Sequence, residues 1–210
     1  MLTAAALGFL LGLRHALDPD HIVALSTLVT RHRSPWSASW VGASWGVGHA
    51  LTILAVGAVV IELRVTVPEQ ISLAAEFGVG ILLVTLGITN LRAARRAWTP
   101  ADADERPLGR TLARSSAVGL AHGLAGSGAL ALLATAAMPT PAAALAYLVV
   151  FGVGTLTGMI ALSQALGAPV ALFGDSAEWH SRLAAGTGLA SLAFGVWLMH
   201  RVGFVEGLLA

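Results

Sequence analysis

The sequence predicts an all-α integral membrane protein with six membrane-spanning segments and a break in the first of them. Three observations predict this fold class. Of the 210 residues, 56% are hydrophobic and 11% are charged, whereas a water-soluble domain carries about 25% charged residues. The hydrophobic residues form long runs, and a helix needs about 20 such residues to cross a bilayer. The 24 glycines lie mostly within these runs, where they allow membrane helices to pack closely.

The six apolar segments are expected at residues 2–31, 37–62, 70–94, 112–137, 141–172 and 181–202. The first and fifth are the longest, and each would be roughly 45 Å long as a straight helix. The hydrocarbon core of a bilayer is only about 30 Å thick. Each also contains a proline, Pro19 or Pro169, which removes a helical hydrogen bond. We therefore expect both segments to be broken or strongly tilted.

The two halves of the chain repeat each other. The sequence Gly-Leu-Arg-His beginning at Gly12 aligns with Gly-Leu-Ala-His beginning at Gly119, at an offset of 107 positions. Glycines in the next two segments align at offsets of 106 and 108: Gly46 and Gly48 with Gly152 and Gly154, and Gly78, Gly80 and Gly87 with Gly186, Gly188 and Gly195. Three segments per repeat would give the second repeat the opposite orientation, as in many secondary transporters. The alternative is that the helices share small-residue spacing for packing alone.

This repeat predicts the domain organisation. Residues 1–96 form the first three-helix repeat, 97–111 a cytoplasmic linker loop, and 112–210 the second repeat. Nine arginines lie in the loops after segments one, three and five or at the adjoining segment ends, and two, Arg64 and Arg201, lie at the opposite side. Because cytoplasmic loops carry the excess of arginine, we expect a multi-pass protein of the cytoplasmic membrane with both termini outside. The net charge of +1 does not indicate a nucleic-acid partner.

Four side chains that can bind metals lie together in the first segment, at His15, Asp18, Asp20 and His21. A charged group at the centre of a bilayer costs about 3 kcal/mol or more, so the cluster requires an explanation. Pro19 would end one helix, and Asp18 and Pro19 suit the N-cap and first position of the next. Such a break would let both histidines face one site. A further histidine, His49, follows two glycines in the second segment.

Three imidazoles and two carboxylates would form a site with nitrogen and oxygen donors. The chain has no cysteine, and such a site suits Ni(II), Co(II), Zn(II), Mn(II) or Fe(II) and disfavours Cu(I). Three other interpretations remain open. His15 and Asp20 could be a hydrogen-bonded pair that stabilises the break, the group could relay protons, or a His–Asp pair could be the general base of a membrane enzyme.

Two further residues are candidates for supporting the site. His122 matches His15 in the repeat, so it either faces the site by pseudo-symmetry or donates a hydrogen bond in helix packing. Arg14 is the one arginine deep within a segment. It either pairs with Asp18 or Asp20 when metal is absent, or extends to the membrane interface.

The segment His-Ala-Leu-Asp-Pro-Asp-His-Ile, beginning at His15, resembles the His-x4-Asp-His signature of the nickel/cobalt transporter (NiCoT) family, which usually reads HAxDADHI. The segment Trp-Gly-Val-Gly-His-Ala-Leu-Thr-Ile, beginning at Trp45, resembles that family's second signature. The short length and the sequence from Gly119 to Leu130 are similar to the UreH-type branch, whose members are membrane proteins associated with urease maturation.

This resemblance implies that His15, Asp20, His21 and His49 bind a transported Ni²⁺ or Co²⁺ ion, with Asp18 in support, and that no resident cofactor is needed. It also implies urease or other nickel-enzyme maturation proteins as partners. The chain lacks the LGxDTATE-type signature of longer members, and Asp18-Pro19 replaces the usual Asp-Ala. The resulting hypothesis is a secondary transporter of Ni²⁺ or Co²⁺. The alternatives are a metal-dependent or His–Asp membrane enzyme, and a metal-binding urease-maturation subunit that does not transport.

Overall fold

The structure is a computed structural model that describes residues 2–30, 34–95, 108–126, 130, 133–134, 138–172 and 176–209. These residues form seven α-helices and a π-helical turn, and they contain no strand. The elements are α1 (Leu2–His15), α2 (Pro19–Val29), α3 (Pro35–Leu63), α4 (Glu69–Ala94), α6 (Leu108–Leu124), α8 (Pro141–Leu172), α9 (Ala177–His200) and η1 (Arg201–Val205). The prediction of an all-helical fold is therefore confirmed.

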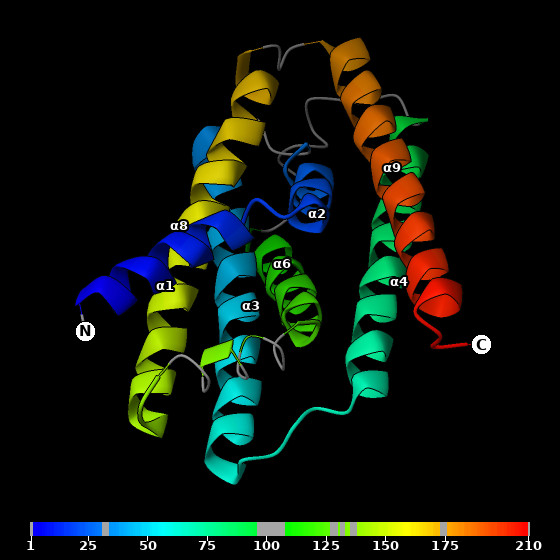
Figure 1. Cartoon of the computed structure of the whole chain (residues 1–210). Coiled ribbons are helices and arrows are strands. Elements are labelled where there is room, and N and C mark those ends of the chain that lie inside the picture. The colour runs from blue at the N-terminus through cyan, green and yellow to red at the C-terminus, as the bar shows by residue number, and fades with distance from the viewer. Residues whose placement is uncertain are drawn as a thin grey trace.

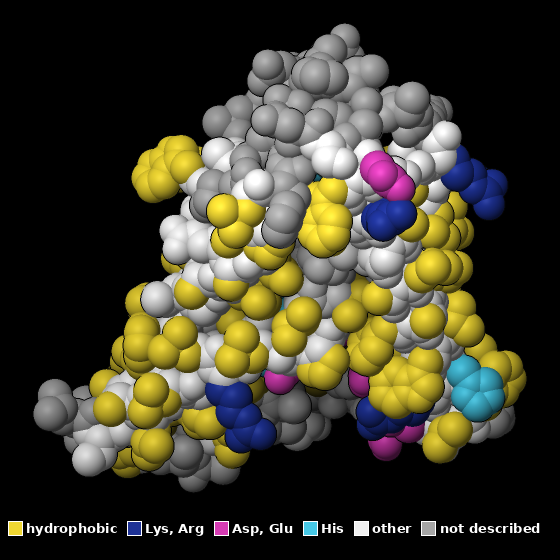
Figure 2. All heavy atoms as spheres, turned by 90° about the horizontal axis from the view of Figure 1, so that it is seen from above, with side chains coloured by type: hydrophobic (Ala, Val, Ile, Leu, Met, Phe, Trp, Pro, Cys, Tyr) yellow, Lys and Arg dark blue, Asp and Glu magenta, His cyan; other side chains and the backbone are white. Residues whose placement is uncertain are grey.

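Four of the helices are long and apolar enough to cross a membrane. They comprise Trp36–Leu63, Glu69–Ala94, Pro141–Val170 and Glu178–Val205, and they correspond to the second, third, fifth and sixth predicted segments. Figure 2 shows the face at the top of Figure 1, on which hydrophobic side chains outnumber charged ones. Large hydrophobic side chains are also exposed along the long helices, among them Leu51, Ile81 and Val149. Exposed apolar side chains suit lipid better than water, because their transfer out of water is favourable.

The first segment is broken at the predicted place. Helix α1 ends at His15, and α2 begins at Pro19. Asp18 between them has an extended backbone (φ −62°, ψ 143°). Pro19 cannot donate the hydrogen bond that would continue α1, so the amides of Leu17 and Asp18 turn back to the carbonyls of Arg14 and His15. Asp18 occupies the N-cap position as expected, but its side chain does not cap α2.

We expect the fifth segment to be broken or strongly tilted, and the structure shows that it is not broken. Helix α8 runs without interruption from Pro141 to Leu172 and includes Pro169. The proline stands three residues before the helix end, so only the last turn follows the missing hydrogen bond. Membrane helices tolerate such a loss where neighbouring groups satisfy the freed carbonyl.

The fourth segment differs from its predicted single span at 112–137. Helix α6 begins at Leu108 and ends at Leu124, and Gly126 has a left-handed backbone with φ +74°. Glycine adopts this conformation at no steric cost, so the chain can leave the helix without a proline. Of the predicted linker, residues 108–111 belong to α6 and residues 97–107 lie outside the described residues.

The long helices pack in antiparallel pairs. Figure 1 shows α3 antiparallel to α8 and α4 antiparallel to α9, with α2 and α6 between the two pairs. Helix α1 packs on α8, and α6 packs on α3. A Cβ atom at Gly87 would lie 2.7 Å from the carbonyl oxygen of Gly188, and one at Gly195 would lie 2.8 Å from that of Gly80. The two contacts correspond to each other under the sequence offset, because adding 108 to residue numbers 80 and 87 gives 188 and 195.

Candidate metal centre

The break between α1 and α2 positions four of the predicted side chains. His15 is the last residue of α1, and Asp20 and His21 lie in the first turn of α2. The carbonyl oxygen of His15 accepts hydrogen bonds from the Asp18 amide at 3.0 Å and from Nδ1 of His21 at 2.7 Å. The two histidine rings meet edge to face, with centroids 4.6 Å apart. A continuous helix would not bring them together, because residues six positions apart point about 120° away from each other.

Helices α3 and α6 add a histidine each. His49 lies on α3 and His122 on α6, and both are buried, at 1% and 2% exposure. A Cβ atom at Gly123 would lie 2.6 Å from the carbonyl oxygen of His49, so the two backbones approach as closely as glycine allows. Their rings lie 5.8 Å apart, and the ring of His21 lies 5.0 Å from His49 and 4.6 Å from His122. His21 therefore stands between the histidines of the other helices.

One ring nitrogen from each of His15, His21 and His49 lies within 4.8 Å of the others. Nε2 of His15 and Nε2 of His49 are 3.2 Å apart. Two nitrogens bound to one ion at about 2.05 Å would be about 2.9 Å apart at a right angle and about 3.4 Å apart at a tetrahedral angle. The observed separation falls between these values, so the two nitrogens are spaced as ligands of one transition-metal ion are. They are also within hydrogen-bond distance, so an ion would take the place of the proton that His49 donates to His15.

Hydrogen bonds determine which nitrogens are free to bind a metal. Nδ1 of His15 lies 2.7 Å from a carboxylate oxygen of Asp18. A carboxylate can only accept, so this nitrogen carries the proton. The same reasoning applies to Nδ1 of His21, which donates to the His15 carbonyl. In the neutral rings Nε2 then has the lone pair. Metal-binding histidines typically donate their other N–H to a carboxylate or a carbonyl, which orients the ring.

A second group of donors shares His21. Asp20, His21 and His122 also each place one donor atom within 4.8 Å of the others. Nε2 of His122 donates to Oδ2 of Asp20 at 3.0 Å, and Oδ1 of Asp20 accepts from the His21 amide at 2.9 Å. Nδ1 of His122 is buried and has no hydrogen-bond partner among the described residues. Of the two roles left open for His122, the structure shows a contact with Asp20 and His21.

Two of the predicted residues lie outside both donor groups. The side chain of Asp18 is half exposed and accepts a hydrogen bond from His15, which orients the His15 ring. Of the two roles left open for Arg14, the described residues do not show the pairing with an aspartate. Arg14 is exposed, and among the described residues the ion pairs of Asp18 and Asp20 are with His15 and His122.

Trp45 is a residue of the site that the sequence motifs do not indicate. It is fully buried, and its ring meets those of His21 and His122 edge to face, at 5.5 and 5.4 Å. It lies four positions before His49, on the same face of α3, and this spacing could have identified it. The ring keeps water from one side of the cluster, and a drier site strengthens electrostatic interactions with an ion.

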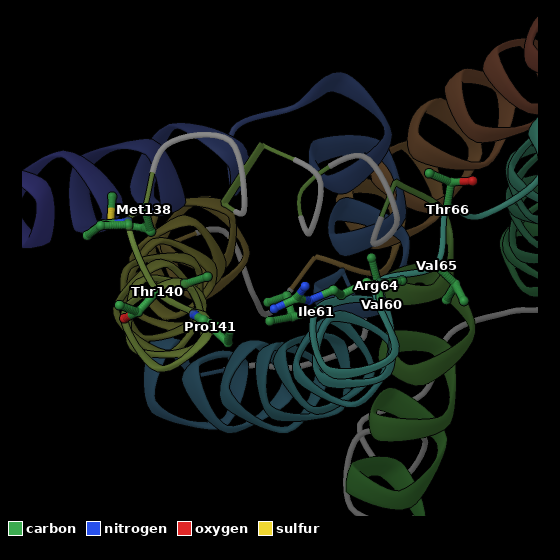
Figure 3. Close-up of a pocket in the computed structure, with 10 residues that line it drawn as sticks. Val60, Ile61, Arg64, Val65, Thr66, Met138, Thr140 and Pro141 are labelled. Atoms are coloured by element: carbon green, nitrogen blue, oxygen red, sulfur yellow. The ribbon is translucent and has the colours of Figure 1, made fainter.

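A separate cavity of about 350 Å³ lies where α3 ends and α8 begins (Figure 3). It contains no histidine or carboxylate, and its lining residues are Val60, Ile61, Arg64, Val65, Thr66, Met138, Pro139, Thr140, Pro141 and Ala144. It is therefore unsuited to a transition metal, and the histidine cluster remains the candidate site.

Comparison with known proteins places the chain in a family. It is 33% identical to the urease accessory protein UreH of Bacillus sp. (strain TB-90) over 99% of this chain and 95% of that protein. It is also 29% and 30% identical to the Arabidopsis thaliana chloroplast proteins FOR GROWTH AND FERTILITY 2 and 1, over 90% of this chain. It spans 56% and 58% of those two longer proteins. No family model and no solved structure matches. The chain belongs to the family of UreH, the UreH-type branch of the nickel/cobalt transporters.

Proposed function

We propose that this protein is a secondary transporter that moves Ni²⁺ or Co²⁺ across the cytoplasmic membrane. The observation that carries this proposal is the convergence of His15, His21 and His49 from three helices, with two Nε2 atoms 3.2 Å apart. Imidazole and carboxylate donors without sulfur suit these ions. The ion would exchange water ligands for imidazoles in a buried site, as a transported ion must.

The proposed architecture is six spans in two inverted three-helix repeats, with α1 and α2 together as the first span. The antiparallel pairing of α3 with α8 and of α4 with α9 supports it (Figure 1). The glycine contacts related by the 108-residue offset support it as well. In such transporters the substrate binds near the midplane at broken helices, and rocking of the repeats exposes it to each side in turn.

The proposed orientation follows from arginine. The starts of α3 and α9 and the end of α4 lie at one end of the molecule, and the end of α3 and the start of α4 lie at the other (Figure 1). Arg92, Arg95 and Arg182 are near the first end, and Arg64 and Arg201 are near the second. We assign the first end to the cytoplasm by the positive-inside rule, which puts both termini outside.

The name of the related UreH protein gives a second candidate function. It is called a urease accessory protein, so this chain would supply metal to urease maturation, either as the transporter or as a binding subunit that does not transport. A membrane enzyme using the hydrogen-bonded His–Asp pairs is a third class of function. These three candidates differ in whether metal crosses the membrane.

The test is nickel uptake into proteoliposomes that contain the purified full-length chain. Variants His21→Ala and His49→Ala each remove one imidazole, and we expect uptake to fall by at least about 10-fold, the low end of the loss seen when partners of metal ligands are removed. His200→Ala is the matched control, since His200 is exposed at the end of α9, away from the cluster, and it should not alter uptake.

Equal uptake by the wild type and both cluster variants would contradict the site assignment. A wild type that binds nickel but transports none would favour the accessory subunit. If it neither binds nor transports nickel or cobalt, the enzyme becomes the better candidate.

A further inference from the structure

The donor atoms of the cluster lie too far apart for one ion to bind all of them. The five donor residues fall into two groups that share His21, and within each group the donor atoms lie within 4.8 Å of one another. We call them the three-histidine position (His15, His21 and His49) and the aspartate position (Asp20, His21 and His122). The five do not form a single group at that distance. Two ligands on opposite sides of one ion are about 4.2 Å apart, so one ion cannot bind all five where they stand.

His21 cannot bind two ions at the same time. Its Nδ1 donates to the carbonyl oxygen of His15 at 2.7 Å, which leaves Nε2 as its one available lone pair. The two positions are therefore alternatives for a single ion. An ion that leaves one position can enter the other while it stays bound to His21.

The second position has features of a ligand site in its own right. The side chain of His122 is almost fully buried, and its Nδ1 has no hydrogen-bond partner among the described residues. Nε2 of His122 and Oδ2 of Asp20 are 3.0 Å apart, close to the separation of about 2.9 Å expected for two ligands at a right angle on one ion. An ion there would take the place of the proton that Nε2 donates to Asp20, and the neutral imidazole would carry its proton on Nδ1. The amide of His21 holds the other carboxylate oxygen, so Asp20 is oriented toward His122 before an ion arrives.

We propose that the metal ion occupies the three-histidine position and the aspartate position one after the other during transport. The ion can visit them in either order, and it stays bound to His21 while it moves between them. The proposal rests on the proposed function and deepens it. It makes His122 a direct ligand from the second half of the chain. The aspartate position offers two imidazoles and a carboxylate in place of three imidazoles, so the ion never loses all its protein ligands during the transfer.

The test is Co²⁺ binding to the full-length chain in lipid nanodiscs, measured by equilibrium dialysis and by the visible absorption of the bound ion. The wild type should bind one Co²⁺ per chain. A His15→Ala/His49→Ala double variant should still bind Co²⁺, at the aspartate position, with a changed spectrum. His122→Gln should still bind it at the three-histidine position, with less than the 10- to 100-fold loss of affinity that removal of a supporting residue causes. All three substitutions together should abolish binding.

Three results would overturn the proposal. Two Co²⁺ ions per wild-type chain would mean that His21 is not shared. No binding by the double variant would mean that the aspartate position does not exist. This conclusion requires that His15→Asn/His49→Asn, which keeps polar side chains, also binds no Co²⁺. It also requires that both double variants elute as folded chains. A loss of 10-fold or more in His122→Gln would mean that His122 supports a single site.

Uptake into proteoliposomes separates a ligand role of His122 from a positioning role. Glutamine keeps an N–H donor for Asp20 but has no imidazole lone pair. If His122 is a ligand, His122→Gln transports at least about 10-fold more slowly while it still binds Co²⁺. Unchanged uptake would overturn the proposal and leave the proposed function intact. If the wild type itself transports nothing, the proposed function fails, and the binding measurements still decide between one position and two.

Discussion

The crossing of α1 and α8 at Gly12 controls the position of His15, although Gly12 binds no metal. A Cβ atom at Gly12 would overlap the backbone carbonyl of Phe151 and would lie 2.8 Å from the backbone nitrogen of Thr155. Ordinary contact begins at 3.4 Å. These atoms belong to the backbone of a long helix and cannot rotate away. Gly12→Ala must therefore move α1 by 0.6 Å or more, the difference between 3.4 and 2.8 Å.

His15 lies three residues beyond Gly12 on the same helix, so its ring moves with α1. Its Nε2 is 3.2 Å from that of His49, and metal–ligand distances vary by only about 0.2 Å. The displacement exceeds that tolerance. We expect Gly12→Ala to weaken Co²⁺ binding about 10- to 100-fold, as for loss of a residue that orients a ligand. Overpacking should also destabilise the fold by about 1–3 kcal/mol.

Co²⁺ titration of the full-length chain in nanodiscs measures the affinity, and reversible unfolding in mixed detergent micelles measures the stability. Gly78→Ala is the matched control, because a Cβ atom at Gly78 meets nothing within 4 Å. It should change neither quantity appreciably. If Gly12→Ala binds Co²⁺ as tightly as Gly78→Ala does, α1 does not approach α8 as described, and the reasoning fails.

Two further predictions concern the support of the site and the orientation of the chain. Asp18→Asn replaces the carboxylate that accepts from Nδ1 of His15 and should lower Co²⁺ affinity about 10-fold or more. The Asp18 side chain does not cap α2, so helix content by circular dichroism should not change; an unaltered affinity would contradict the orienting role. Because the chain has no cysteine, Thr66→Cys and Ser34→Cys each give one label site. A membrane-impermeant maleimide should label the first variant in intact cells and the second only after permeabilisation, and the reverse pattern would contradict the proposed orientation.

The sequence predicted those features that depend on a few neighbouring residues. The break at Pro19 follows from a missing N–H group, and the four long helices follow from the length and hydropathy of their segments. The sequence did not indicate the end of α6 before Gly126, because glycine permits a left-handed turn without requiring it. It also suggested a break at Pro169, where the position near the end of α8 makes the proline tolerable.

The same distinction applies to the candidate site. The sequence by itself determined which donor atoms are available and that α1 and α2 present His15 and His21 on the two sides of a break. Only the tertiary structure decided that His49 and His122 join them, that Asp18 orients a ring, and that Arg14 stays outside. Backbone constraints act over a few residues, whereas the meeting of side chains from four helices depends on how closely those helices cross. Here glycines such as Gly12 and Gly123 allow that approach, because they place no Cβ atom between the backbones.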